Sequence, residues 1–405
     1  MQRIAILGLR LSLAGHFQYL RGLPPYASFP PPAGSPSLPV MPISASLAQQ
    51  IAALAAHYDA AVLPPWRRAG WNDTLRLPYE SLDAASGQAL PAQRYRAMAC
   101  ARQLYVHALA GETVHAGALF DSLSRHFGDG QGGWIYSVDA AGAPLDATRD
   151  LYTHAFVIFA SAAWHRSRGA GALQVLRQTV DVVEQRFGDG NGLYHAALGK
   201  GFDEIGAGVL QNPIMHLTEA YLAAHAATGD PWFAQRLGEL AHAVRACFVD
   251  PATGCIAELP QGAAGNRVEP GHQFEWYSLL VASPAVFAGH PLVADLRRAF
   301  DFARRHGVVA GTLGVSAALD AGGAVSDSTQ RIWAQTEYAR ALALHGDAAA
   351  LADLEAWCGQ FRRRFLHAGG WHECLAADGS VTRTDMPSTT PYHLATAYLS
   401  LKALA

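Results

Sequence analysis

Apolar positions recur at helical spacing in stretches that are rich in alanine and leucine. Three such stretches are 95–110 (YRAMACARQLYVHALA), 216–227 (HLTEAYLAAHAA) and 336–344. Apolar residues three and four positions apart mark the buried face of an amphipathic helix. Gly229 and Gly346 follow the second and third stretches, and glycine after a helical run is a common C-terminal stop. The pattern therefore predicts helices that begin and end repeatedly along the chain.

A second pattern separates these helical stretches: a few alternating residues, followed by Asp or Gly at a turn. Six segments show it, among them GGWIYSVDAAGAPLD near Tyr136, NGLYHAALGKG near Tyr194, TGCIAELPQG near Ile256 and GGWHECLAADGSVTR near His372. Successive segments are between 56 and 62 residues apart, which indicates one supersecondary unit repeated six times. The alternation and the Asp-x-x-Gly turns predict short β-hairpins.

Each period then holds two helices, which gives about twelve helices in all. Two architectures fit this arrangement: an open superhelical solenoid, or a closed ring of six helical hairpins, the (α/α)6 barrel. A solenoid needs a polar repeat at its end, whereas the sixth segment is as apolar as the second. We therefore predict an all-α fold, an (α/α)6 barrel with short β-hairpin loops at one end. It spans residues 45–405 as a single catalytic domain.

Residues 1–44 read as a disordered leader, because eight prolines lie between Gly22 and Pro42. Met41 directly precedes the folded pattern and is an alternative start of translation. No run of 18 apolar residues is present, so we expect no membrane span. The five cysteines form no C-x-x-C pair and are odd in number, which is typical of buried thiols in a reducing compartment. We expect a cytoplasmic protein.

The composition narrows the functional classes. Half of the residues are apolar and only 16% are charged, which excludes a disordered chain. A net charge of -3 argues against a nucleic-acid binder, whose surface carries a concentrated basic face. Against this low charge stand 18 histidines, and histidine titrates near neutral pH. The surplus points to proton chemistry.

Polar clusters follow the hairpin segments, each near the start of a predicted helix. The clusters are Arg102; Tyr152 with His154; Asn212 with His216; His272 with Glu275; Arg331, Trp333 and Gln335 with Glu337; and His393. They recur at nearly the same period as the hairpins, which predicts that they lie at one level of one barrel end and face a common axis. Each residue alone also has a structural explanation, such as an ion pair for Arg102 or helix-dipole pairing for Glu275 and Glu337. The shared period favours an active site.

The residue types in these clusters bear on four kinds of chemistry: metal binding, glycoside hydrolysis, acyl transfer and proton abstraction. His272-x-x-Glu275 places both residues on one face of a helix, as metal ligands would be, or the glutamate orients the imidazole. A glycosidase would use Glu275 and Glu337 but leaves the histidines unexplained. Acyl transfer lacks a G-x-S-x-G motif. Histidines with an arginine and acids suit proton abstraction beside a carbonyl, where Arg102 and Asn212 would stabilise the enediolate oxygen.

The motifs QNPIMHLTEAYLA, EPGHQFEW, RIWAQTEYARAL and PYHLATAYL, together with the GGW loops, resemble the N-acylglucosamine 2-epimerase superfamily. That superfamily includes aldose–ketose isomerases of mannose and cellobiose 2-epimerases, and the resemblance covers about residues 50–405. It implies an (α/α)6 barrel and metal-independent chemistry through a cis-enediolate. By this resemblance His272 and His393 are the catalytic pair, one opening the sugar ring and one moving the C2 proton. The resemblance assigns the sugar pocket to Arg102, Tyr152, Asn212, His216, Glu275, Trp333 and Glu337.

The chain departs from the family pattern at Ser278, where many relatives carry an aromatic residue, and at Ala334, where proline is common. Both departures bear on which sugar is bound. The near-neutral charge, without a visible lysine- or arginine-rich phosphate cradle, favours an unphosphorylated sugar. Similarity of EPGHQFEW and RIWAQTE to the mannose-isomerase-like branch favours conversion of D-mannose to D-fructose.

Two alternatives stay open: epimerisation of N-acetylglucosamine and N-acetylmannosamine, and a non-catalytic helical-repeat module that binds carbohydrate. In each case the partner is a small sugar, with no nucleic acid, no membrane, no metal and no cofactor. We expect a monomer or a homodimer.

Overall fold

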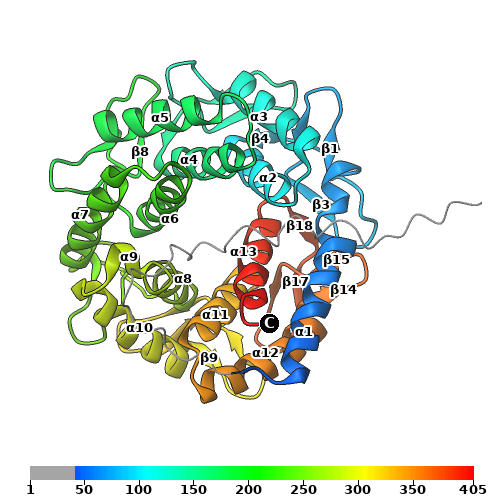
Figure 1. The fold of residues 1–405 in the computed structure, drawn as a ribbon, viewed down its shortest axis with the longest axis vertical. Helices are drawn as coiled ribbons and strands as arrows, with labels where there is room; N and C mark the ends of the chain where they lie inside the picture. Colours follow the sequence, from blue (N-terminus) through cyan, green and yellow to red (C-terminus); the bar gives the residue numbers. More distant parts are fainter. Residues whose placement is uncertain (1–41) are drawn as a thin grey trace, which may run out of the picture.

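Twelve long helices form two concentric rings in the computed structural model, which describes residues 42–405 (Figure 1). The first 41 residues of the predicted leader lie outside the described residues. The inner ring consists of α2 (Ala97–Leu109), α4 (Leu151–Arg166), α6 (Gln211–Thr228), α8 (Pro270–Val281), α11 (Ile332–His345) and α13 (Thr390–Lys402). The outer ring consists of α1 (Ala45–His57), α3 (Thr113–Phe127), α5 (Ala172–Val182), α7 (Pro231–Phe248), α10 (Pro291–Gly307) and α12 (Ala348–Phe365).

The two ends of the described chain close the ring. Each inner helix packs against the next, and α13 returns to pack against α2. The outer partner of α13 is α1, which also contacts α12 (Figure 1). The outer helix that packs against the last inner helix therefore comes from the start of the fold. This closure confirms the predicted barrel and excludes the open solenoid.

Burial differs between the rings, as their sequences require. In α8 every residue from Pro270 to Leu280 is buried, whereas α10 buries one stripe that includes Leu296 and Phe300. A helix that is apolar on all sides is a buried helix, and an amphipathic one covers a core. Burial of each large apolar side chain contributes roughly 1.5–3 kcal/mol before entropy is counted. The low fraction of charged residues reflects this inner ring.

The predicted helix stops are confirmed. Gly229 ends α6 with φ of 69°, and Gly346 ends α11 with φ of 68°. This left-handed conformation costs an ordinary L-residue about 1–2 kcal/mol, which explains glycine at both positions. The following residues, Asp230 and Asp347, cap the next outer helices by accepting backbone N–H bonds.

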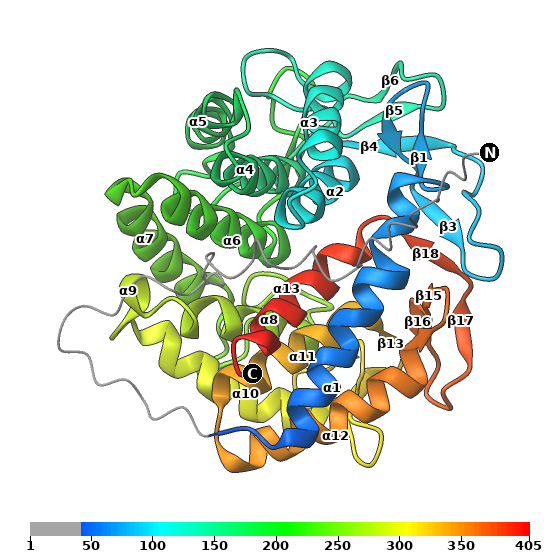
Figure 2. The same ribbon diagram turned by 45° about the vertical axis from the view of Figure 1, so that its right-hand side comes forward.

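Short strands gather at the end of the barrel where the inner helices begin (Figure 2). The strand that precedes an inner helix pairs with the segment that follows the next outer helix. Three such pairs are β4 (Arg94–Arg96) with β5 (Ser137–Asp139), β13 (Gln330–Arg331) with β16 (Cys374–Leu375), and β18 (Asp385–Pro387) with β3 (Ser81–Asp83). These pairings fix the loops over the start of each inner helix.

The remaining elements are short. The strands are β1 (Trp71–Asn72), β2 (Leu77–Pro78), β6 (Pro144–Asp146), β7 (Arg149–Asp150), β8 (Ala197–Leu198), β9 (Val308–Val309), β10 (Gly314–Val315), β11 (Ala318–Leu319), β12 (Val325–Asp327), β14 (Leu366–His367), β15 (Gly370–Trp371) and β17 (Val381–Arg383). The helical pieces are η2 (Tyr58–Val62), η3 (Pro64–Arg67), η4 (Val183–Phe187) and α9 (Pro284–Phe287). Across residues 42–405, the helices fall short of what a membrane span requires in length and apolar character.

The predicted hairpin near Ile256 differs from the others. Ile256 forms an isolated bridge with Val249 rather than a strand. Beyond it, the side chain of Asn266 bonds both the N–H and the C=O of Leu259, at 2.9 and 2.8 Å. A side-chain amide thus replaces the second strand, and Pro260 next in sequence lacks the N–H that a ladder needs.

Candidate active site

A cavity of about 890 Å³ lies inside the inner ring and opens among the short strands. All six inner helices contribute side chains to its wall. Eight of the nine predicted site residues line it: Arg102, Tyr152, Asn212, His216, His272, Glu275, Trp333 and His393. The ninth, Glu337, is fully buried behind the wall and contacts His393. The structure therefore brings together the residues that the shared period singled out.

Other polar residues of those clusters have structural partners. His154 contacts the Asp150 carbonyl oxygen through Nδ1 at 2.7 Å and does not line the cavity. Gln335 bonds the backbone of Val315 on both sides, at 2.8 and 3.1 Å, and so holds a hairpin. Arg331 does line the cavity.

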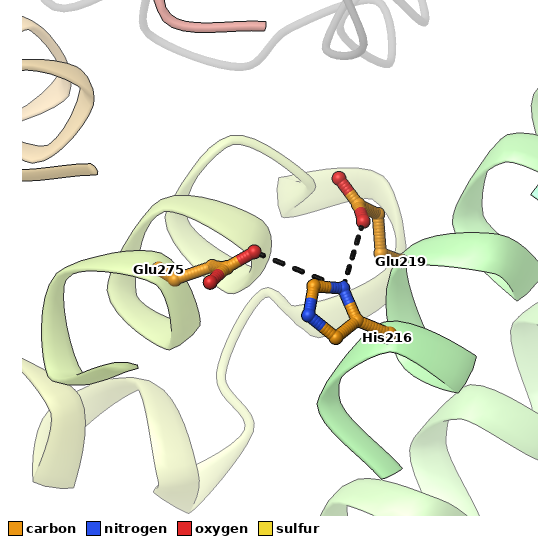
Figure 3. Close-up of side chains that lie close together, drawn as sticks. All are labelled: His216, Glu219 and Glu275. Atoms are coloured by element: carbon orange, nitrogen blue, oxygen red, sulfur yellow. Dashed lines mark hydrogen bonds and ion pairs between the residues drawn. The ribbon is translucent and has the colours of Figure 1, made fainter. Parts of the chain in front are cut away.

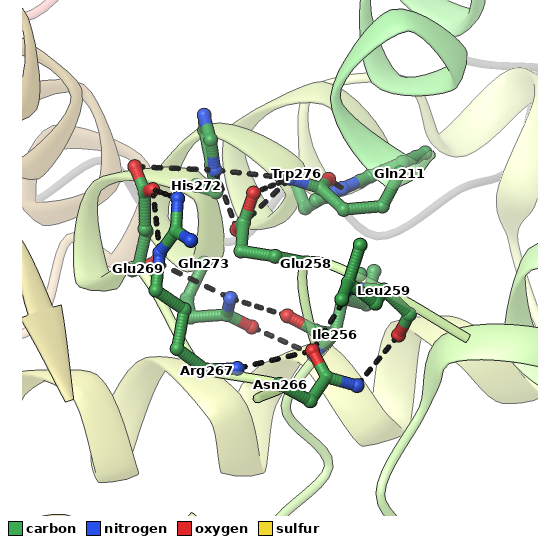
Figure 4. Close-up of polar contacts among 10 residues, drawn as sticks. All are labelled: Gln211, Ile256, Glu258, Leu259, Asn266, Arg267, Glu269, His272, Gln273 and Trp276. Carbon is green, nitrogen blue, oxygen red and sulfur yellow. Dashed lines mark hydrogen bonds and ion pairs between the residues drawn. The ribbon is translucent and has the colours of Figure 1, made fainter. Parts of the chain in front are cut away.

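His272 has a carboxylate partner, Glu258, that was not among the predicted site residues. Its Nδ1 lies 2.7 Å from Oε1 of Glu258, a buried residue of the loop after α7, while its other ring nitrogen points away from that carboxylate (Figure 4). The amide of Gln211 donates to both oxygens of Glu258 at 3.0 Å. The same amide nitrogen lies 2.9 Å from Nδ1, because both groups point at one carboxylate. The Gln211 oxygen in turn accepts a bond from the indole of Trp276 at 2.7 Å.

The loop that carries Glu258 is held on both sides. Its N–H donates to the Arg267 carbonyl at 3.0 Å. The side chain of Gln273 bonds both the N–H and the C=O of Ile256 at 2.8 Å (Figure 4). Gln273 follows His272 directly, so α8 fixes the imidazole and the position of its partner together.

This environment favours the charged imidazole. Burial opposes the charge of His272, but the carboxylates of Glu258 and then Glu269 outweigh burial and raise its pKa above the ordinary value of 6.5. Burial opposes ionisation of Glu258 as well, yet the charge of His272 and its hydrogen bonds hold the pKa of this carboxyl below the usual range. Each residue therefore stabilises the charged form of the other.

The pairing corrects one expectation from the His272-x-x-Glu275 motif. Glu275 neither orients His272 nor shares a group of metal-donor atoms with it. Three residues along a helix advance about 4.5 Å, which sets Glu275 deeper than His272. Both oxygens of Glu275 lack a hydrogen-bond partner within the described part of the chain.

His393 lies in the opposite electrostatic environment. Its Nδ1 is 3.2 Å from Oε1 of Glu337, but Glu337 also accepts a bond from Arg340 at 2.7 Å. Burial first, and then the nearby guanidinium groups of Arg102 and Arg340, lower the pKa of His393 well below 6.5. The imidazole is therefore neutral at pH 7. A bond from Nδ1–H to Glu337 leaves the lone pair of Nε2 available.

Three buried carboxyl groups lie beneath the cavity. Glu219 accepts bonds from Tyr392 and from Nδ1 of His216 at 3.3 Å, and Glu275 approaches the same nitrogen at 3.9 Å (Figure 3). Burial, followed by the charges of Glu337 and Glu219, raises the pKa of Glu275 well above its ordinary value. Burial likewise raises the pKa of Glu337 to about 7. Glu275 is thus a neutral acid that can donate a hydrogen bond.

Trp333 connects the two imidazoles. Its ring centroid lies 4.9 Å from that of His272 and 5.8 Å from that of His393. Several polar atoms of the wall have no hydrogen-bond partner among residues 42–405: Asn212 Oδ1, Trp333 Nε1, Arg102 Nε and both Glu275 oxygens. Buried polar groups normally find partners, so these atoms mark where a polyhydroxylated ligand would bind.

Three separate groups of side chains have the composition of a metal site, and within each group the donor atoms lie within 4.8 Å of one another. They are His216 with Glu219 and Glu275, Glu258 with Glu269 and His272, and Glu275 with Glu337 and His393. In each group a carboxylate already accepts a protein hydrogen bond, from Tyr392, from His272 or from Arg340. The absence of a metal stays a prediction, and chelation tests it.

Six arginines line the cavity: Arg94, Arg96, Arg102, Arg267, Arg331 and Arg383. They come from segments that are far apart in the chain. No local pattern predicts this grouping, because only closure of the ring brings these segments together.

Comparison with known proteins adds to this geometry. The sequence pattern of the family described as N-acylglucosamine 2-epimerase matches residues 79–397. The chain is 28% identical over 390 residues to mannose-6-phosphate isomerase of Rhizobium meliloti (strain 1021), covering 87% of this chain and 97% of that protein. A D-mannose isomerase structure matches with a TM-score of 0.78 and 20% identity, covering 89% of this chain and 99% of the other. Cellobiose 2-epimerase from Bacillus thermoamylovorans B4167 gives 0.77 and 18%, covering 88% and 99%. The two structural likenesses show the shared barrel fold.

Proposed function

Because the chain belongs to the N-acylglucosamine 2-epimerase family, whose members isomerise or epimerise sugars, we propose that it converts an aldose into its ketose. The sugar is a hexose of the D-mannose/D-fructose type, and the chemistry moves a proton between C2 and C1. One observation carries the proposal. Two imidazoles whose pKa values are shifted in opposite directions, those of His272 and His393, line one cavity beside Trp333.

His272 acts as the acid that opens the sugar ring. Its Nδ1–H is committed to Glu258, so the proton on Nε2 is the one that can reach a ligand. An imidazolium with a raised pKa donates that proton to the ring oxygen as the C1–O5 bond breaks, and the imidazole then takes up the proton lost by the C1 hydroxyl. The product is the open-chain aldehyde, which acidifies the hydrogen on C2.

His393 acts as the base. Its neutral Nε2 takes the proton from C2, exchanges it with solvent and delivers a proton to C1, while a second proton moves from O2 to O1, so that the atoms balance. The intermediate is a cis-enediolate, and its charge needs donors. Arg102, the amide of Asn212 and the protonated carboxyl of Glu275 supply them at the cavity wall.

One observation favours epimerisation at C2 as the second candidate. His216 is a third imidazole in the wall, and burial, opposed by Glu219, lowers its pKa to about 4. It is therefore neutral at pH 7 and offers a second base. A proton returned to C2 from another side would give the epimer, as in interconversion of N-acetylglucosamine and N-acetylmannosamine.

Incubation of the protein with D-mannose in deuterated water, followed by NMR, tests the proposal. We expect fructose with deuterium at C1. Deuterium at C2 of an epimeric product would instead support epimerisation. Absence of exchange with any aldose would contradict an enzymatic role and favour the non-catalytic carbohydrate-binding module. His195→Asn is the matched control, since His195 does not line the cavity.

A further inference from the structure

Two arginines at the mouth of the cavity have no ion-pair partner. Three of the six lining arginines are neutralised by carboxylates: Arg96 by Glu80, Arg267 by Glu269, and Arg383 by Asp385. A fourth, Arg102, donates to the hydroxyl of Tyr152 at 2.7 Å. Within residues 42–405, Arg94 and Arg331 form no ion pair, and their side chains are exposed at the opening. The proposed proton chemistry uses neither residue.

The carboxyl groups of the wall have other partners or other surroundings. Glu258 is paired with His272, and Glu269 with Arg267. Glu373 accepts bonds from Trp371 and Thr390, and burial raises its pKa, as it does for Glu275 and Asp150. Asp146 accepts a bond from the N–H of Thr148. Within residues 42–405, no carboxylate forms an ion pair with Arg94 or Arg331, so both guanidinium groups are free to bind an anion.

The fold places the unpaired arginines around the proposed base. Arg94 lies on β4 just before α2, and Arg331 is the last residue before α11. These two inner helices pack against α13, which carries His393, on either side. In the sheet β13–β16–β17, Arg331 and Arg383 both register with Cys374, so their side chains emerge on the same face. Of these two guanidinium groups, that of Arg331 is the one without a carboxylate partner among the described residues.

Arg331 is also connected to the reaction centre. Its guanidinium carbon lies 5.3 Å from the ring of Trp333, and that ring lies 4.9 Å from His272. The indole ring of Trp333 thus lies close to both the His272 imidazole and the Arg331 guanidinium. Arg331 therefore lies on the side of Trp333 where the far end of a sugar with C1 and C2 at the histidines would find a cation.

We propose, resting on the proposed function, that the substrate carries an anionic group at the end remote from the reacting carbons, and that Arg331 binds it with support from Arg94. A phosphate ester is the simplest such group. Guanidinium groups bind phosphate through paired N–H bonds, and such bonds are stronger than neutral ones. This substrate class replaces the unphosphorylated sugar expected from the sequence.

The test compares D-mannose 6-phosphate with D-mannose in wild-type protein, Arg331→Met, Arg94→Met and the control Arg305→Met. Arg305 is exposed on α10, outside the cavity. We expect kcat/KM to favour the phosphorylated sugar at least tenfold in wild type. The ratio of the two values should fall at least tenfold in Arg331→Met and at least threefold in Arg94→Met. It should stay unchanged in Arg305→Met and be partly restored in Arg331→Lys.

Binding separates this inference from the proposed function. Calorimetric titration of His393→Asn with mannose 6-phosphate should show binding that weakens with added NaCl, and that weakens at least tenfold when Arg331→Met is added. If this holds but no hydrogen exchange occurs in wild type, the proposed function fails and the anion site stands. Turnover of mannose with no preference for the phosphorylated sugar, or binding indifferent to Arg331, would overturn the inference.

Discussion

His272 and His393 are equally buried, at 6% exposure each, yet the protein raises the pKa of the first and lowers that of the second. Burial alone lowers the pKa of both. The difference comes from the carboxylate beside each ring. Glu258 is stabilised as an anion by Gln211 and pairs with His272 alone, whereas Glu337 is bound to Arg340. The charge of a buried histidine is thus set by what else its partner binds.

The comparison also explains how one residue type serves two roles. In the His272 half of the cavity, the Glu258 carboxylate stabilises the protonated imidazole, which can then donate a proton. In the His393 half, Arg102 and Arg340 make a charged imidazole unfavourable, so the ring stays ready to accept a proton. A substitution on the His272 side of the cavity can therefore be compared with one on the His393 side.

The largest effect is expected at the base. His393→Asn keeps a hydrogen-bonding side chain but removes the nitrogen that takes the C2 proton. General base catalysis contributes about 10²–10⁴-fold, so we expect loss of at least a thousandfold in the rate of deuterium exchange. His195→Asn is the control, with activity near that of wild type. Exchange within tenfold of wild type in His393→Asn would show that another residue is the base.

Arg340→Met should destabilise the fold. The guanidinium is buried and is the direct partner of Glu337, so its removal leaves Glu337 and Glu219 without compensation. Breaking a buried pair costs about 3–5 kcal/mol, which urea denaturation measures. The control Arg305→Met should stay within about 0.5 kcal/mol of wild type. An equally small change in Arg340→Met would mean that the carboxyl groups are already protonated without it.

A moderate effect is expected at Glu258. Glu258→Gln keeps an acceptor for His272 but removes the charge that raises its pKa, and we expect kcat/KM to fall about 10–100-fold at pH 7.5. The acid form of His272 is lost as pH rises through its pKa, so the basic limb of the pH profile should move to lower pH. The acid limb, set by the depressed pKa of His393, should not move.

Glu269→Gln is the matched control for this change. It removes the same charge at 3.7 Å from Nδ1 of His272, without a direct hydrogen bond. The basic limb should shift less than in Glu258→Gln. A larger shift in Glu269→Gln would contradict the pairing described here.

The smallest effect is expected on chelation. Incubation with EDTA followed by gel filtration should change kcat/KM by less than twofold, because the carboxylates of the donor groups are bound to protein donors. Loss of activity, and its recovery on adding a divalent ion, would assign a metal to one of the three donor groups.

Much of the site could be predicted because it follows from one period. A residue at the start of an inner helix, such as His272 or His393, has its direction fixed by the barrel, and spacing alone finds it. Glu219 also left a signal, since HLTE repeats the His-x-x-Glu spacing of HQFE. Glu258 left a weaker one, a single acid within the hairpin segment TGCIAELPQG.

The rest depends on contacts that no local pattern contains. Glu258 reaches His272 because Gln273 of α8 binds the loop after α7 at Ile256, and Asn266 closes that loop on itself at Leu259. The arginines that line the cavity come from segments as distant in sequence as those of Arg94 and Arg383, which meet when α13 closes on α2. The pairing predicted from the His272-x-x-Glu275 spacing was also wrong, because the two residues share a helix face but lie at different depths in the barrel.

The charge states of the two imidazoles can be observed directly by nitrogen-15 NMR of protein labelled at histidine, with His272→Asn and His393→Asn used for assignment. At pH 7 we expect both ring nitrogens of His272 to be protonated, and His393 to be neutral with its hydrogen on Nδ1. On titration, His272 should lose its proton above pH 6.5, while His393 should gain one only far below that value. Joint titration of both rings near 6.5, or a charged His393 at pH 7, would contradict the division of roles.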